Sequence, residues 1–336
     1  MPVSANALTM AQYAILSNEP LVQAVTFSLI DAGSIMARDI PFVNKQSLIA
    51  TGVRWEGNLP LVTWVNVNEE GTTTSGTPTP YQEQVYILRN YIDVDKYLVQ
   101  DQNQIVDPRA AQVGAYLRSV AYDFNTKFIN NNHATGDPKA IVGIRARIDN
   151  PSTFGVRPEN KINANAVDLS TAGATAGTFA AFTEFIDQLL WSVDSPDGTG
   201  VVLYMNDVMQ RRWDRLARQF SGAGGFSQAQ DALGRTVTQY KNAVIRDVGF
   251  QRDQATRIIT TTETATGADG ASVHTSIYAV NYSAEHFGGW QFGPLVAQDL
   301  GLMENGTIYR TLIDWAGGVI NQSTRSLGRL YGIKLS

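Results

Sequence analysis

The sequence contains no cysteine and little histidine, and both deficits limit the chemistry that the chain can perform. Without cysteine there is no disulfide bond, thiolate nucleophile or cysteine-ligated metal. The three histidines, His133, His274 and His286, do not have the spacing of a zinc hydrolase and are interpreted as surface or turn residues. P-loop and G-x-S-x-G nucleophile motifs are absent as well. We therefore predict no catalytic, cofactor-binding or metal site, and no enzyme.

Long apolar runs and charged residues are also scarce. No stretch approaches the roughly 18 apolar residues of a membrane span, and residues 1–12 do not resemble a secretory signal. We therefore expect that the chain is made in a cytoplasm and does not associate with a membrane. Charged residues make up 17% of the chain, against about 25% in a typical domain. We infer that part of the surface is buried against other copies. The net charge of -5 argues against a protein that coats nucleic acid, but not against a wall that encloses it.

The N-terminal hundred residues predict an arm followed by a hairpin. Two apolar stripes indicate short helices within residues 1–40; the first comprises Leu8, Ala11, Ile15 and Leu16, and the second Leu21, Val25, Leu29 and Ile30. Residues 59–67 (LPLVTWVNV) and 84–88 (QVYIL) are strand-like, and the glycine-, proline- and threonine-rich residues 68–82 between them predict a long tip. An ordinary surface hairpin and an arm that reaches a neighbour both remain open.

A long helix is predicted over residues 107–131. Asp107 is a suitable N-cap and Pro108 suits the first helical position. The apolar residues that follow fall on a single helical face: Val113, Leu117, Val120, Phe124 and Phe128.

The remainder predicts an α+β arrangement without strict strand–helix alternation. Strands are expected at 140–148, 201–204, 236–240, 243–248, 257–262, 276–281, 309–320 and 327–333. Two amphipathic helices are expected, one burying Phe179, Phe182, Ile186, Leu189 and Val193, and one burying Met209, Trp213, Leu216 and Phe220.

Some charged residues offer weak alternatives to this structural interpretation. Asp194 and Asp197 fit a capped turn better than a calcium loop. Asp93 and Asp95 fall on the same solvated face of a strand. The arginines at 211, 212, 215 and 218 are interpreted as a solvated face that pairs with acidic neighbours rather than as a phosphate site, because no aromatic stacking platform accompanies them.

In chain order, the arm, the long hairpin, the long helix and the α+β region resemble the major capsid proteins of tailed bacteriophages, which share the HK97-like fold. The phrases QYKNAVIRDVGF (239–250) and YRTLIDWAGGVINQSTRSLGRLYGI (309–333) add to the resemblance. It covers nearly the whole chain but rests on element order rather than on an invariant motif. It implies an α+β, HK97-like fold with an N-terminal arm (1–51), an extended hairpin or E-loop (52–100), a peripheral (P) domain (101–177) with spine helix 107–131, an axial (A) domain (178–305) and a C-terminal return into the P domain (306–336).

The same resemblance implies a function. It is that of a major capsid protein which forms hexamers and pentamers of an icosahedral shell around double-stranded DNA, without sequence-specific DNA binding. The shell belongs to a virion assembled in the host cytoplasm. Because only residues 1–51 precede the hairpin, we expect a separate scaffolding protein or an already trimmed chain; a portal and a decoration protein are further expected partners. The candidate contacts between subunits are Trp64, Glu69, Glu70, Arg89, Arg211, Arg215 and Arg218.

Other functions remain open. An encapsulin-type nanocompartment shares the fold but encloses protein cargo. A hydrolase with a dispersed acidic site is a second alternative from a different class. A secreted β-rich binding module is disfavoured by the missing signal and cysteines.

Overall fold

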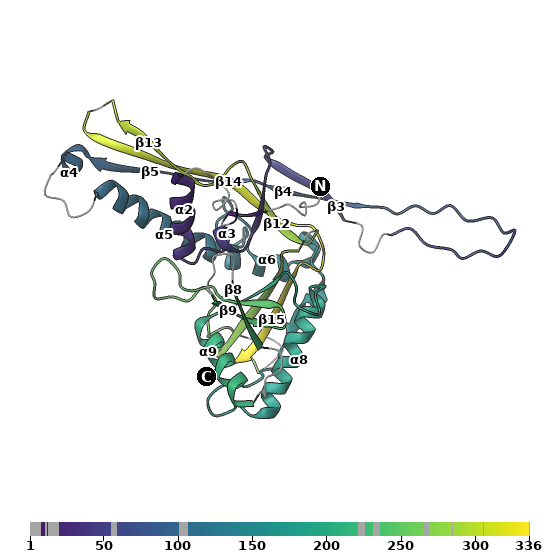
Figure 1. The fold of residues 1–336 in the computed structure, drawn as a ribbon. Coiled ribbons are helices and arrows are strands. Elements are labelled where there is room, and N and C mark those ends of the chain that lie inside the picture. Colours follow the sequence, from purple (N-terminus) through teal and green to yellow (C-terminus); the bar gives the residue numbers. More distant parts are fainter. Residues whose placement is uncertain are drawn as a thin grey trace.

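The structure, a computed structural model, describes residues 8–10, 12, 20–54, 59–100, 107–220, 226–230, 236–264, 269–283, 285–304 and 306–335. Figure 1 shows a body built on two sheets, with a hairpin that extends far from the body on one side. Of the predicted first stripe, Ala11, Ile15 and Leu16 lie outside the described residues, and Leu8 lies in a two-residue strand rather than in a helix.

The upper sheet has six strands in the order β1-β2-β12-β14-β13, and β5 pairs with the other edge of β14. Ten residue pairs join β5 to β14, from Tyr86↔Gly317 to Asp95↔Ile308. The short helix α4 (Lys96–Gln100) follows β5. The strands are β1 (Leu8–Thr9), β2 (Pro41–Asn44), β5 (Tyr86–Asp95), β12 (Phe287–Gln291), β13 (Val296–Leu302) and β14 (Ile308–Asn321).

The long helix α5 (Pro108–Asn130) packs beneath this sheet and confirms the predicted helix. The Asp107 side chain accepts a hydrogen bond from the Arg109 backbone N–H at 2.9 Å, as expected of an N-cap. The predicted apolar face is buried, except that Val113 is only partly covered. Helices α2 (Pro20–Asp31) and α3 (Ile35–Arg38) contact α5, where the Asn125 amide accepts from Ile35 N at 2.9 Å.

The lower sheet has seven strands in the order β6-β15-β11-β7-β10-β9-β8. Both parallel and antiparallel pairs occur in it, which agrees with the α+β prediction. Helices α8 (Ala176–Ser192) and α9 (Asp207–Phe220) bury the predicted residues in the core on one side of this sheet, apart from Phe220, whose side chain lies outside the described part of the chain. The strands are β6 (Lys161–Asn163), β7 (Val201–Met205), β8 (Phe226–Gln230), β9 (Thr236–Tyr240), β10 (Ala243–Asp247), β11 (His274–Asn281) and β15 (Leu327–Lys334).

The opposite side of the lower sheet faces α5. Tyr204 on β7 meets Phe128 of α5 edge to face, with ring centroids 6.3 Å apart. The Tyr204 hydroxyl donates to Asp39 at 3.0 Å and lies 2.8 Å from the Tyr282 hydroxyl. Burial raises the pKa of both tyrosines well above the usual value. The two sheets therefore share a continuous core through α5.

Three strand predictions are wrong. Residues 59–67 form no strand; the hairpin strands are β3 (Ile49–Arg54) and β4 (Thr79–Gln84), nearer the body. Residues 144–149 form helix α6 instead, because Ile144 and Ile148 are four residues apart and bury the same helical face. Residues 257–262 make only an isolated bridge. Short turns of helix follow α6, namely α7 (Pro151–Phe154) and the 3-10 turn η1 (Pro158–Asn160).

The division of the chain into arm, hairpin, P domain, A domain and C-terminal return stays a prediction. The sheets cross two of its boundaries. Strands β12 and β13, within 178–305, lie in the sheet that covers α5. Strand β15, within 306–336, lies in the other sheet, beside β11.

Candidate assembly surfaces

The hairpin presents an apolar strip that no other described part of the chain covers. Trp64 is 96% exposed and Val67 is 92% exposed. The exposed apolar side chains of this limb are Leu59, Leu61, Val62, Trp64, Val65 and Val67. Exposed apolar side chains that form a continuous patch, rather than scattered single residues, mark contact surfaces between proteins.

Polar contacts hold the two limbs of the tip together. The hydroxyls of Thr63 and Thr72 lie 2.9 Å apart across the limbs. At the turn, the Glu69 carboxylate accepts from the Asn66 backbone N–H at 2.9 Å. Glu70 is exposed, and within the described chain it has no ion-pair or hydrogen-bond partner.

The root of the hairpin is anchored by buried charge. Arg147 of α6 has a fully buried side chain and donates two hydrogen bonds to Glu83 of β4, at 2.5 and 3.1 Å. Its Nε donates to the Val142 carbonyl at 3.2 Å. On β3, Arg54 lies over the Tyr81 ring and donates to the Asn321 carbonyl. A fixed root thus supports an uncovered tip.

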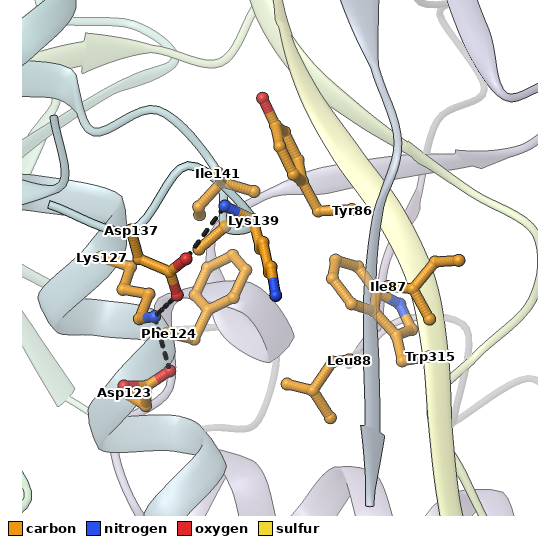
Figure 2. Close-up of a pocket in the computed structure, with 11 residues that line it drawn as sticks. Tyr86, Ile87, Leu88, Asp123, Phe124, Lys127, Asp137, Lys139, Ile141 and Trp315 are labelled. Atoms are coloured by element: carbon orange, nitrogen blue, oxygen red, sulfur yellow. Dashed lines mark hydrogen bonds and ion pairs between the residues drawn. The ribbon is translucent and has the colours of Figure 1, made fainter. Parts of the chain in front are cut away.

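A cavity of about 200 Å³ lies between α5 and the start of β5 (Figure 2). Its walls are largely aromatic and aliphatic. Phe124 and Trp315 both line it and meet each other nearly edge to face, with ring centroids 6.1 Å apart (Figure 2). Trp315 is held in place because its indole N–H donates to Gln291 at 3.1 Å. The lining residues are Tyr86, Ile87, Leu88, Asp123, Phe124, Lys127, Asp137, Lys139, Ala140, Ile141 and Trp315.

Asn131, at the end of α5, positions the loop that closes this cavity. Its side-chain amide donates to the carbonyls of Asp137 and Ile141 at 2.9 and 2.7 Å. Its amide oxygen accepts from Asp137 N at 3.0 Å. Gly143 is required nearby, because a Cβ there would lie 2.6 Å from the Asn131 backbone nitrogen.

The charges at the cavity rim are unequally paired. Lys127 contacts Asp137 at 2.6 Å and Asp123 at 3.9 Å. The hydrogen bond from Lys127 lowers the pKa of Asp137 below its usual value. Lys139 also lines the cavity, and Figure 2 shows its side chain beside Phe124. Within the described chain, no carboxylate lies within ion-pair distance of the Lys139 ammonium group.

Arg89, a predicted contact residue, is bound to its own chain. It faces Asp314 across the β5–β14 pair and makes two hydrogen bonds with it, at 2.9 and 3.2 Å. Arg310 pairs with Asp93 in the same way, at 2.7 Å, and lowers the pKa of that carboxyl. Asp93 is therefore an ion-pair partner rather than a free solvated group.

The predicted arginines of α9 lie together, away from the hairpin. Arg211 contacts Asp207 at 2.7 Å, and Arg218 donates to the Asp214 carbonyl at 3.2 Å. Arg215 is half-buried. Asp207 also accepts from Arg257, and this hydrogen bond lowers the pKa of Asp207. Part of the arginine charge is thus balanced within the chain.

The described residues give no geometric support to a hydrolase. No group of three or more metal-ligating side chains is found among them, and none of their helices is long and apolar enough to cross a membrane. The Ser283 hydroxyl lies 3.2 Å from His286 Nδ1, whose Nε2 is 3.7 Å from Asp194. That hydroxyl donates its single proton to the Asn281 amide oxygen, so His286 does not activate it.

One histidine departs from its prediction. His274 is fully buried on β11 rather than at the surface or in a turn. Its Nδ1 lies 2.8 Å from the Ala271 carbonyl, and its Nε2 lies 3.0 Å from Asp269. This position serves packing between the strand and the loop that precedes it.

Sequence comparisons return no match to a family model or to a curated protein. Solved structures match over nearly the whole chain. The holo-SrpI encapsulin complex from Synechococcus elongatus PCC 7942 has a TM-score of 0.56 at 10% identity, covering 98% of this chain and 96% of that one. The capsid of a native GTA particle has a TM-score of 0.56 at 11% identity, covering 92% and 90%. A structure of Mycobacterium phage Bobi has a TM-score of 0.51 at 11% identity, covering 90% and 89%.

The chain has the HK97-like fold, as the sequence resemblance implied. At 10–11% identity the likeness is one of fold.

Proposed function

We propose that this protein is a shell subunit, specifically the major capsid protein of a tailed bacteriophage. Copies of it form the hexamers and pentamers of an icosahedral shell that encloses double-stranded DNA in a virion. Assembly takes place in the host cytoplasm, with a separate scaffolding protein, a portal and a decoration protein as further partners. The protein is not an enzyme.

The exposed tip on an anchored root is the observation that carries this proposal. In a monomer, the apolar strip around Trp64 at the hairpin tip is exposed to water. The root of the same hairpin is held in place by the buried Arg147–Glu83 pair. Contact with a neighbouring copy removes that apolar surface from water, which favours association. The net charge of -5 suits a wall that encloses DNA without binding it tightly.

An encapsulin-type nanocompartment is the second candidate. The encapsulin aligns with the same TM-score of 0.56 as the GTA capsid, and over more of the chain. The contents of the particles distinguish the two functions. Nuclease-protected double-stranded DNA in particles purified from their natural source supports the capsid, whereas a bound protein cargo supports the nanocompartment.

Negative-stain microscopy of the purified chain tests shell formation itself. We expect closed shells of uniform size. Small discrete particles at every protein concentration would contradict the proposal.

A further inference from the structure

We propose that a hollow at the start of α9 binds a phosphate group, held by the guanidinium groups of Arg211 and Arg212 and by the hydroxyl of Thr171. The ligand is a free polyphosphate or the phosphate of a larger molecule, and the site recognises the phosphate alone. This inference goes beyond the proposed function, because the hollow is formed within one copy of the chain.

The hollow lies against the first turns of α9, in the lobe around the seven-stranded sheet (Figure 1). Its volume is about 310 Å³, and it is lined by Val208, Arg211 and Arg212. Because a water molecule takes up about 30 Å³ in the liquid, there is room for a phosphate group with part of its hydration shell. Two of the three described lining residues are arginines, whose planar guanidinium groups match the oxygens of a phosphate. The lining therefore favours a phosphate over an uncharged ligand.

Arg212 is held in position, but its charge is not balanced by a carboxylate. Its Nη1 donates a hydrogen bond to the hydroxyl of Thr171, in the loop that precedes α8, at 2.6 Å. Among the described residues, no carboxylate lies within ion-pair distance of Arg212. Asp168, in the same loop, accepts from Ser170 N at 2.8 Å instead. Because the Thr171 hydroxyl accepts from Arg212, its own proton remains available to a bound anion.

The charge of Arg211 is only partly balanced. Its Nη2 lies 2.7 Å from the Asp207 carboxylate, and its Nε donates to the Asp207 carbonyl at 3.2 Å. The same carboxylate accepts two hydrogen bonds from Arg257, at 2.5 and 3.2 Å. In the described part of the chain, three arginines thus share one carboxylate around the hollow. This local excess of positive charge, in a chain whose net charge is -5, attracts anions to this surface.

The donors around the hollow suit a phosphate better than a nucleobase or a carboxylate. No aromatic side chain is among the described residues that line the hollow, so no stacking platform for a base is present. Two guanidinium groups and one hydroxyl together supply donors for three oxygens, which a terminal phosphate has and a carboxylate does not. The sequence analysis interprets these arginines as pairing with acidic neighbours. The structure supplies such a neighbour for Arg211 but not for Arg212.

Calorimetric titration of the purified chain with inorganic triphosphate at low salt tests the site. Arg212→Gln should weaken binding about ten-fold or more, because it removes charge-assisted hydrogen bonds. Arg212→Lys keeps the charge but loses the planar fork, so its affinity should lie between those of the unaltered chain and Arg212→Gln. Thr171→Val removes the hydroxyl with little change of volume and should weaken binding by a smaller factor.

The matched control is Arg118→Gln. Arg118 is exposed on α5, and its replacement changes the net charge by the same amount without touching the hollow. Binding by this variant should stay within about two-fold of the unaltered chain, because exposed charges farther away than a Debye length are screened. Melting curves monitored by circular dichroism show whether each variant is folded. No binding of triphosphate or DNA by the folded, unaltered chain would overturn the site, and so would equal losses in Arg212→Gln and Arg118→Gln.

A DNA duplex of about 20 base pairs, followed by fluorescence anisotropy in the same buffer, identifies the source of the phosphate. Binding of triphosphate alone, lost in Arg212→Gln, assigns the site to a free polyphosphate. Binding of the duplex, lost in the same variant, assigns it to a nucleic-acid backbone, and the slope of log K against log salt should then fall by about 1. Duplex binding that is the same in Arg212→Gln as in the unaltered chain would exclude the backbone. Shell formation is measured separately by microscopy, so either proposal can fail without the other.

Discussion

Two tryptophans, one in the hairpin and one in the lobe around the seven-stranded sheet, lie in opposite environments. Trp213 of α9 is 1% exposed and meets Phe182 edge to face at 5.2 Å, whereas Trp64 is 96% exposed. The lobe therefore completes its packing within a single chain. The apolar residues of the hairpin limb 59–67 are exposed in the single chain, and under the proposed function they gain burial from other copies. Stability and assembly should depend on different residues.

Replacing the two tryptophans with alanine breaks this comparison most directly. Trp213→Ala should lower the free energy of unfolding by about 3–5 kcal/mol, because it removes a buried aromatic side chain and leaves a cavity. Trp64→Ala should change it by less than about 0.5 kcal/mol, since the side chain is exposed. It should still prevent shell formation. Urea unfolding followed by circular dichroism gives the stabilities, and light scattering gives assembly; similar losses of stability in both variants would disprove the distinction.

The anchored root sharpens the comparison. Arg147→Met should cost about 3 kcal/mol, because Glu83 is then left buried without its partner. The paired variant Glu83→Gln/Arg147→Met should recover part of the loss, since no isolated charge remains. Limited proteolysis should cut the hairpin faster in the single variant than in the double variant. Equal cleavage in both would mean that the ion pair does not hold the hairpin.

Acid should lower the stability of the body. The hydrogen bond from Arg257 holds the pKa of Asp207 below its unfolded value, so this pair contributes stability above about pH 4. That contribution is lost as the pH falls through the folded-state pKa. The melting temperature should therefore fall on acidification. This fall should be smaller than the falls caused by Trp213→Ala and Arg147→Met. In Asp207→Asn the fall should be shallower, and an unchanged pH profile would exclude this pair as a cause.

The arginines of α9 should have the smallest effect. Arg211→Ala removes an exposed pair with Asp207, and Arg257 still holds that carboxylate, so stability should change by less than about 0.5 kcal/mol. If the arginines contact an acidic neighbour, Arg211→Ala/Arg215→Ala should slow assembly at low salt and not at high salt. Light scattering measures this rate, and a salt-independent effect would exclude the electrostatic contact.

Local patterns in the sequence predicted the elements that depend on local signals. Asp107 and Pro108 mark the start of α5, and the spacing of Leu117 and Phe124 identifies its buried face. The limb at 59–67 was mispredicted because β-propensity describes a preference, while a strand needs a partner that the single chain does not supply. Residues 144–149 were mispredicted because a short apolar run fits a buried strand and a short helix equally well.

The cavity was beyond sequence reasoning for another reason. It is assembled from β5, the end of α5 and Trp315, segments that lie far apart along the chain. No local pattern in the sequence marks these side chains as neighbours. The exposed candidates Trp64 and Glu70 came from the hairpin prediction, but no pattern in the sequence indicates what they contact. Their contact with a neighbouring copy stays a proposal.

Shell formation by the chain with and without its tip tests the central claim most directly. Removing residues 60–77 and closing β3 to β4 with a short turn should leave the melting temperature unchanged, because the tip contributes almost nothing to the core. Negative-stain microscopy should then show closed shells for the unaltered chain and none for the shortened chain. Normal shells from the shortened chain, or a well-folded monomer of the unaltered chain at every concentration in sedimentation, would contradict the account.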